Sequence, residues 1–211
     1  SEAVPEEVVL AARRGEEAVV LAWLDGGGRV DERVEYTCGD GSWASGMTLL
    51  MVAMANGRAE LAEALLRRDA DISLQHSDGG TALGLAAANG HEKLDELALR
   101  HGAEIDQRSR DGMTALIQAS GGGHEWVVDA LIRHGAKIDL QDSKGSTALM
   151  FAAHYGHPAG VLRLLRAGAD MALRSSGRPA LHYARDKGHA ECARALEEHA
   201  AAKAAAEAAE E

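Results

Sequence analysis

The sequence predicts an all-α solenoid of about five stacked helix-turn-helix units with short hairpin turns, because three short signals recur in fixed phase. The first is a turn followed by Thr-Ala-Leu, which repeats every 33 residues from Asp78 to Asp111 to Lys144. The second is a Gly-His pair at a constant distance after each turn, and the third is a Gly-Ala pair near the end of the unit. Weaker copies of the first signal at Ser45 and Ser176 extend the period in both directions.

One unit shows why each of its elements is expected to be helical. Thr81 can cap a short Ala-rich helix that runs to Asn89, and the glycine that follows permits the chain to reverse. A second helix over 91–101 is amphipathic, with three leucines on its inner side. Gly102 then suits the left-handed conformation beyond a helix end. One such hairpin cannot bury its apolar face alone, so stacking must supply the core.

The period divides the chain into end units, inner units and a tail. The first unit contains two helical segments without a preceding turn, which is typical of a polar-faced cap. The tail is rich in Ala and Glu and is expected to prolong the last helix or to fray. We expect an N-terminal capping repeat at 1–37, a second repeat with an extended preceding loop at 38–77, further repeats at 78–110, 111–143 and 144–175, a C-terminal capping repeat at 176–199 and the tail at 200–211.

The order G-x-T-A-L, A-A, G-H and G-A-x-I resembles the ankyrin repeat and extends over roughly residues 4–199. The family's T-P-L-H signature is altered, since Ala replaces its Pro in three units and its His is kept only as His182. The resemblance implies a right-handed stack of helical hairpins that binds other proteins through the turn tips and the short inner helices. It also implies that the imidazole of the Gly-His pair ties the turn between the two helices.

Composition and charge argue against several classes of partner. Asp and Glu number 33 against 22 Lys and Arg, and a net charge of -11 has the wrong sign for binding nucleic acid or an anionic membrane. No apolar run approaches the roughly 20 residues of a membrane span, so membrane contact is expected only through a membrane-protein partner. The distant Cys38 and Cys192 fit a reducing intracellular compartment. The cytoplasm is the preferred location, and an organelle reached through a removed upstream segment stays open.

The candidate chemical motifs each have a structural explanation. His154 and His157 form an H-x-x-H pair, but His157 belongs to the periodic Gly-His position, and no Cys or carboxylate completes a metal cluster. The glycines at 121–123 end a short helix instead of following a strand, so they do not match a phosphate-binding loop. Cys192 aligns with apolar inner positions, and Cys38 lacks a recognisable base. We therefore expect no catalytic residue, no metal site and no cofactor.

These observations favour a non-catalytic protein-interaction module. A free adaptor and a permanent subunit of a larger complex both stay open, and an enzyme with an unrecognised site is the least favoured alternative. Candidate contacts lie beside the turns and at the ends of the inner helices, where residues vary between units and include types enriched at interfaces. The candidates are Tyr36, Trp43, Met47, Asn56, Asn89, Arg110, Met113, Ser146, His154, Tyr155, Arg178, Asp186 and Lys187.

Residues 33–45 lengthen the connection between the first and second units by nine residues. Connections longer than the geometry requires are often functional. Two interpretations stay open. The segment either projects at one end of the concave strip and supplies Tyr36 and Trp43 as aromatic anchors, or it folds back over the cap with Trp43 near Val30 and Val34.

Three residues depart from the pattern at their repeat positions. Asp95 occupies a position that is apolar in the other units, so the third unit is expected to pack poorly. Gly160 lies inside an outer helix, where it should weaken that helix. Trp126 stands where other units carry charged residues and indicates a second contact on the convex side.

Overall fold

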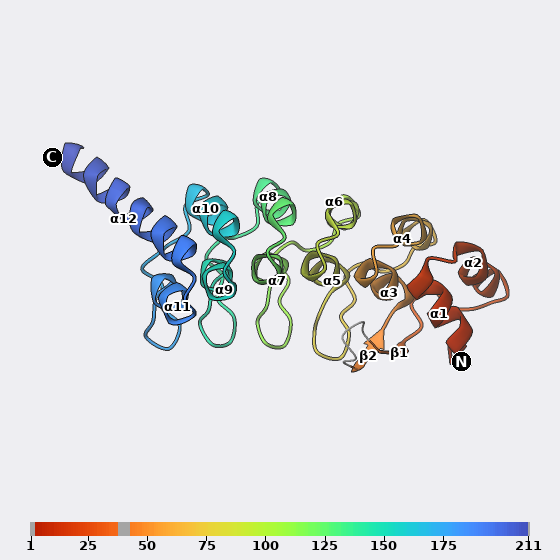
Figure 1. The fold of residues 1–211 in the computed structure, drawn as a ribbon. Helices are drawn as coiled ribbons and strands as arrows, with labels where there is room; N and C mark the ends of the chain where they lie inside the picture. The colour runs from red at the N-terminus through yellow and green to blue at the C-terminus, as the bar shows by residue number, and fades with distance from the viewer. Residues whose placement is uncertain (1–2, 38–42, 211) are drawn as a thin grey trace.

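The computed structural model describes residues 3–37 and 43–210, which form twelve helices and a two-stranded hairpin. Figure 1 shows the helix pairs standing side by side in one row, with the two termini at opposite ends. The prediction of an all-α solenoid is confirmed. The pairs are α1 (Glu6–Arg14) with α2 (Glu17–Asp25), α3 (Leu49–Ala55) with α4 (Ala59–Leu66), α5 (Ala82–Ala88) with α6 (Glu92–Arg100), α7 (Ala115–Gly122) with α8 (Glu125–Arg133), α9 (Ala148–Tyr155) with α10 (Pro158–Arg166), and α11 (Ala180–Asp186) with α12 (Ala190–Glu210).

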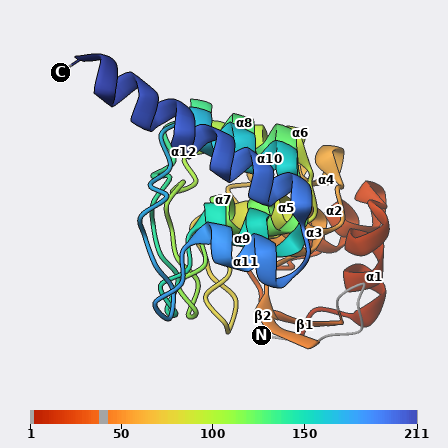
Figure 2. The same cartoon turned by 60° about the vertical axis from the view of Figure 1, so that its left-hand side comes forward.

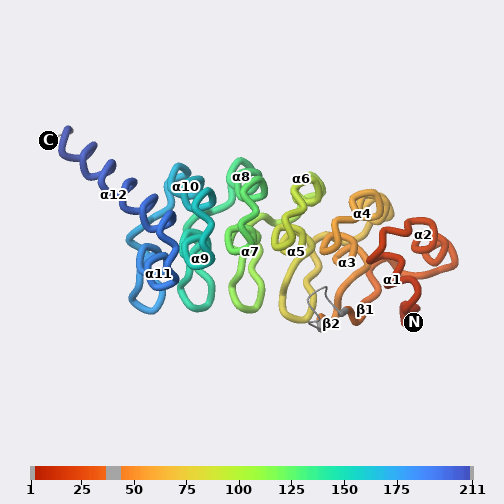
Figure 3. Tube along the Cα trace, in the orientation of Figure 1, coloured from red at the N-terminus to blue at the C-terminus, as the bar shows by residue number. Residues whose placement is uncertain are grey.

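The helices form two layers. Figures 1 and 2 show α5, α7, α9 and α11 in one layer and α6, α8, α10 and α12 in the other, and the turns extend to one side of the stack. The tube in Figure 3 shows that each turn is a narrow loop between one outer helix and the next inner helix. Buried Ala, Leu, Val and Met side chains between the layers form one continuous core along the stack.

Threonine caps fix the start of the inner helices α3, α5, α7 and α9. Thr48, Thr81, Thr114 and Thr147 are buried, and each hydroxyl accepts a hydrogen bond from a backbone amide of the first helical turn, at 3.0–3.4 Å. Such a bond satisfies one of the amides that a helix N-terminus leaves without an intrahelical partner. The last inner helix instead begins after Pro179, which offers no side-chain cap.

The periodic histidines join neighbouring units. The Nε2 atoms of His91, His124, His157 and His189 lie 2.9–3.3 Å from backbone carbonyl oxygens at the end of the preceding inner helix. The family resemblance implied a tie within one unit, and the structure shows that this hydrogen bond runs between units. Each ring also packs on the glycine that ends the preceding inner helix. At Gly90, for example, an added Cβ would lie 2.5 Å from the His124 ring.

The extended connection forms a hairpin that the sequence did not predict. Strands β1 (Val34–Thr37) and β2 (Trp43–Met47) pair antiparallel, with a bulge between Val34 and Tyr36. Tyr36 and Met47 are buried, and Asn56 donates a hydrogen bond of 2.7 Å to the Tyr36 hydroxyl. Assigning Tyr36 and Met47 to a partner-binding surface was therefore wrong, because both side chains belong to the core. Cys38 and the side chain of Trp43 lie outside the described residues.

Asp95 is fully buried in α6, at 0% exposure. Among the described residues, neither of its carboxylate oxygens has a hydrogen-bond partner. Burial raises the pKa of Asp95 from 3.8 to about 8, and the negative charge of Glu92 adds to the effect. The third unit thus contains a carboxyl group at a position that other units fill with apolar side chains.

Gly160 is expected to weaken α10 without any compensating contact. An added Cβ at this position would meet Ala152 and His157 at 3.7 Å, which is ordinary van der Waals contact. Gly160→Ala should therefore raise the free energy of unfolding by about 0.5–1 kcal/mol, measured by urea denaturation. Gly156→Ala is the matched control, because Gly156 has a φ of 78° and its Cβ would lie 2.6 Å from the His189 ring. The control should destabilise the protein, and equal losses in both variants would contradict the prediction.

Candidate functional site

The inner helices end differently along the stack. At matching positions in their last turn, α5 carries Ala88 and α7 carries Gly121, whereas α9 carries His154 followed by Tyr155. Tyr155 is 54% exposed, which is unusual for a large aromatic side chain. The surface of the inner layer therefore changes from small residues to aromatic residues at α9.

A groove of about 410 Å³ lies beside these residues, between α9, α11 and the two turns that precede them. We call it the aromatic groove. Its walls combine aromatic rings from the helices with hydroxyl groups and one lysine from the turns. The residues that line it are Lys144, Ser146, Met150, Phe151, His154, Tyr155, Ser175, Ser176 and Tyr183.

The rings of the aromatic groove support one another. The centroids of His154 and Tyr155 are 4.8 Å apart with the rings edge to face, and those of His154 and Tyr183 are 6.0 Å apart. Phe151 and Tyr155 are 6.2 Å apart and tilted by 33°. The Tyr183 hydroxyl donates a hydrogen bond of 2.9 Å to the carbonyl oxygen of Ser175. These contacts hold the apolar surface in place before any partner arrives.

The polar wall of the groove is also fixed by internal hydrogen bonds. The hydroxyls of Ser146 and Ser175 lie 2.9 Å apart, and Ser175 donates to the carbonyl oxygen of Lys144 at 2.8 Å. Asp142 accepts bonds from the backbone amides of Lys144 and Ser146 at 2.9 and 2.7 Å. The side chain of Lys144 is exposed at the edge of this ordered turn.

The surroundings of His154 favour its neutral form. Burial lowers the pKa of His154 below its usual value, the neighbouring Lys187 and His189 lower it further, and only Asp186 opposes them. A neutral imidazole between two tyrosine rings extends the apolar wall instead of adding a charge to it. Lys187 and Asp186 both act on the pKa of His154, so these two charges lie close to the groove.

The structure brings together only part of the predicted contact set. Ser146, His154 and Tyr155 line the aromatic groove, Asp186 and Lys187 lie at the end of α11 near His154, and Arg178 is exposed in the turn that carries Ser175. The remaining described candidates lie elsewhere. Arg110 pairs with Asp78 at 3.2 Å, Met113 packs against the core, Asn89 donates to the carbonyl oxygen of Leu85, and Asn56 is bonded to Tyr36.

Sequence reasoning missed Phe151 and Tyr183, which form much of the apolar wall. Each is the fourth residue of its inner helix. Earlier units have Val52, Leu85 and Gln118 at this position. The signal that would have found them is the appearance of two aromatic rings in consecutive units, in a chain with only 3% aromatic residues. Equivalent positions of consecutive units lie on neighbouring helices, so Phe151 and Tyr183 are expected on the same side of the stack.

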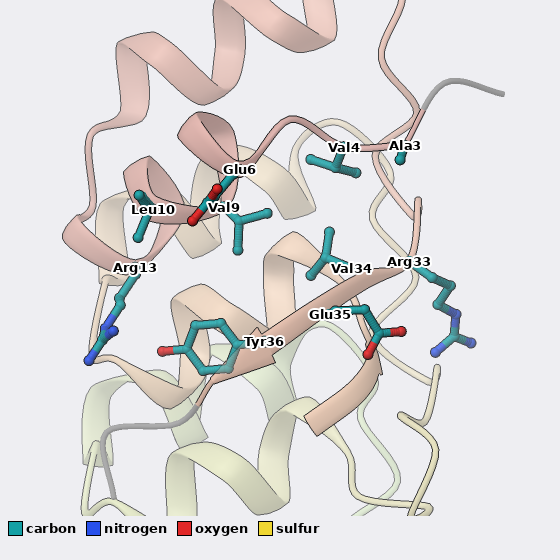
Figure 4. A pocket seen from close by; sticks show the side chains of 10 residues that line it. All are labelled: Ala3, Val4, Glu6, Val9, Leu10, Arg13, Arg33, Val34, Glu35 and Tyr36. Atoms are coloured by element: carbon teal, nitrogen blue, oxygen red, sulfur yellow. The ribbon is translucent and has the colours of Figure 1, made fainter. Parts of the chain in front are cut away.

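A second cavity of about 390 Å³ lies at the N-terminal end of the stack. Figure 4 shows Glu6, Val9 and Leu10 of α1 on one side of it and Val34 and Tyr36 of β1 on the other. Its rim carries charges of both signs, from two acidic residues and two arginines. Tyr36 is the one predicted contact residue at this cavity, and its hydroxyl is already bonded to Asn56.

His157 and the free thiol of Cys192 have structural roles in the described part of the chain. His157, half of the H-x-x-H pair, uses its Nε2 atom to bind the carbonyl oxygen of Gly121 at 3.0 Å. No group of three or more His, Cys, Asp or Glu side chains that could hold a metal ion occurs among the described residues. Cys192 is a buried free cysteine, and burial raises the pKa of its thiol. Within the described ranges, no helix has the length and apolar character needed to cross a membrane.

Comparison with known proteins adds one family match. A family model described as ankyrin repeats (3 copies) matches residues 8–109, 50–142, 85–175 and 131–207, so the matches together extend over most of the chain. A comparison with curated proteins finds no match.

Proposed function

Because the chain belongs to the ankyrin repeat family, whose members are generally protein-interaction modules, we propose that it binds a partner protein in the aromatic groove without catalysing a reaction. The observation that carries the proposal is Tyr155, a half-exposed aromatic side chain at the centre of an ordered aromatic cluster. Tyrosines in preformed hollows often dominate interface energies, because they bury much surface at little entropic cost.

The neighbouring inner helix helps to fix the rings of the groove. Gly121 of α7 faces the rings of Phe151 and Tyr155, and a Cβ added there would lie 3.2 Å from Phe151 and 3.7 Å from Tyr155. The absence of a side chain at Gly121 therefore lets the Phe151 ring pack closely against α7. Rigid stacking keeps these units in register, so contacts to several units add without a new ordering cost.

A permanent subunit of a larger assembly is the second candidate, and Trp126 is the observation that favours it. This side chain is 66% exposed on α8 of the outer layer. However, the Arg163 guanidinium lies 5.3 Å from the centre of the indole ring and also pairs with Glu125 and Asp129, so the indole already has an intramolecular partner. We therefore favour a reversible adaptor that binds through the inner layer.

The buried thiol and the net charge support a cellular location and a class of partner. A buried free thiol at Cys192 supports a reducing intracellular compartment, with the cytoplasm preferred. The net charge of -11 supports a protein partner over nucleic acid or an anionic lipid surface.

The proposal predicts that Tyr155→Ala reduces partner capture about tenfold, equivalent to about 1.4 kcal/mol of binding free energy. The measurement is quantitative cross-linking and mass spectrometry of partners retained by tagged protein in native cells. Trp126→Ala is the matched control, since it removes an exposed aromatic ring from the outer layer. If Tyr155→Ala captures partners as well as wild type and Trp126→Ala does not, the binding site lies on the outer layer and the proposal of the aromatic groove is wrong.

A further inference from the structure

The charges around the aromatic groove have the opposite sign to the chain as a whole. The protein has a net charge of -11, yet three exposed cations belong to this end of the inner layer. Lys144 lines the groove, Arg178 pairs with the lining residue Ser175, and Lys187 lies near His154. Asp142, in the same turn as Lys144, accepts hydrogen bonds from two backbone amides. Asp186 is the remaining acidic residue close to His154. The local balance at the groove is therefore positive.

These three cations differ from those in the earlier turns. Arg33 donates to the carbonyl oxygens of Gly46 and Gln75, Arg108 donates to that of Gln141, and Arg110 pairs with Asp78. Those arginines connect one turn to the next. Within the described part of the chain, by contrast, Lys144, Arg178 and Lys187 form no ion pair. Their charges are available to a partner.

The groove therefore combines an apolar wall with a cationic edge. Phe151, Tyr155 and Tyr183 provide the wall, and the neutral His154 adds no opposing charge. A cationic ligand stacked on these rings would face three like charges against two acids, Asp142 and Asp186, so the electrostatic balance disfavours it. A ligand with an apolar side chain next to a carboxylate matches both parts of the surface.

We propose that the aromatic groove binds an acidic peptide segment of a partner protein, with an apolar side chain of the segment against Tyr155 and Tyr183 and an adjacent carboxylate paired with Lys144. This inference rests on the proposed function and specifies the chemistry of the partner. The segment binds with its carboxylate at the turn and its apolar side chain over α9 and α11, because Lys144 precedes α9 and the rings lie on the two helices.

The test is selection of a random linear peptide library, displayed on phage, against the full chain. We expect the enriched peptides to carry Asp or Glu beside an aliphatic or aromatic residue. Synthetic, labelled versions are then titrated by fluorescence anisotropy. Lys144→Glu should weaken their binding about fivefold or more, because it replaces an attraction by a repulsion, and added salt should reduce the difference.

Lys203→Glu is the matched control, since Lys203 is exposed on α12 outside the groove and the charge change is the same. It should change peptide affinity less than about twofold, because exposed charges that lie apart are strongly screened. Tyr155→Ala should weaken binding in the same assay. Thermal unfolding of each variant is measured in parallel, and both lysine positions are exposed, so the substitutions are expected to preserve the fold.

The remaining outcomes separate this inference from the proposed function. Enriched peptides that depend on Tyr155 but lack acidic residues, or that bind Lys144→Glu and wild type equally, would overturn the inference and leave the proposed function intact. Failure to enrich any peptide would overturn the inference. Peptides unaffected by Tyr155→Ala would overturn both proposals. If a labelled single-stranded oligonucleotide binds the wild type but not Lys144→Glu, the ligand of the groove is a nucleic acid and the inference of an acidic peptide is overturned.

Discussion

Asp95→Val is expected to raise the free energy of unfolding at pH 7 by about 1–3 kcal/mol, measured by urea denaturation. The carboxyl group is fully buried and, among the described residues, neither oxygen has a hydrogen-bond partner. Valine fits the position because Val20, Val128 and Val161 occupy it in other units, where they are buried. The substitution thus replaces an unsatisfied polar group by a side chain that the repeat already accommodates.

The pH dependence distinguishes this explanation from a simple packing gain. The folded pKa of about 8 lies above the usual value of 3.8, so the folded protein binds the Asp95 proton more tightly than the unfolded chain does. The contribution of Asp95 to stability is therefore complete below about pH 4 and is lost as the pH rises to about 8, with a slope of at most about 1.4 kcal/mol per pH unit.

Urea denaturation at pH 5, 6, 7 and 8 measures this slope. Asp95→Val should remove it, and Asp95→Asn should also remove it with a smaller gain in stability, because the amide is a buried polar group that does not titrate. Amide hydrogen exchange should slow across α6 in the valine variant and approach the rate of α8. Identical pH slopes in wild type and Asp95→Val would show that Asp95 is solvated or paired in solution.

The repeat period predicted most of the fold because its signals are local. A threonine cap, a glycine that permits reversal and a histidine that reaches the preceding unit each act over a short distance, and each recurs. The hairpin was missed because it occurs once. The alternation of Val34 and Tyr36 with charged neighbours is a strand signal, but it is only four residues long and falls in a segment that the period treats as an insertion.

The candidate site could be predicted only in part for a similar reason. His154 and Tyr155 stood out because the three preceding units have small residues or Asn at their positions. Met47 was assigned to the contact surface because the residue at this point of the turn varies between units and methionine is enriched at interfaces. In later units the matching Met113 and Ser146 are indeed partly exposed. In the second unit, pairing of β2 with Val34 of β1 encloses Met47, and no periodic signal reports that contact.

Tyr36→Ala is expected to lower the free energy of unfolding by about 3–5 kcal/mol, the range for removing a buried aromatic ring. Tyr36 is only 5% exposed and belongs to the same buried cluster as Val34 and Met47. Tyr36→Phe separates the ring from the hydroxyl. It should cost about 0.5–1.5 kcal/mol, because Asn56 loses its bond to the Tyr36 hydroxyl but keeps its 2.7 Å bond to the carbonyl oxygen of Val52.

The same variants decide between the two roles of the hairpin. If residues 33–45 cover the first inner helices, Tyr36→Ala lowers the urea midpoint, while peptide binding at the aromatic groove, measured well below that midpoint, stays unchanged. The hairpin lies beside α1 and α3, whereas the groove lies between α9 and α11, so the packing loss is not transmitted to the groove. Unchanged stability of Tyr36→Ala would contradict a core role for Tyr36. If partner capture is also lost in this variant, the hairpin is part of the binding surface.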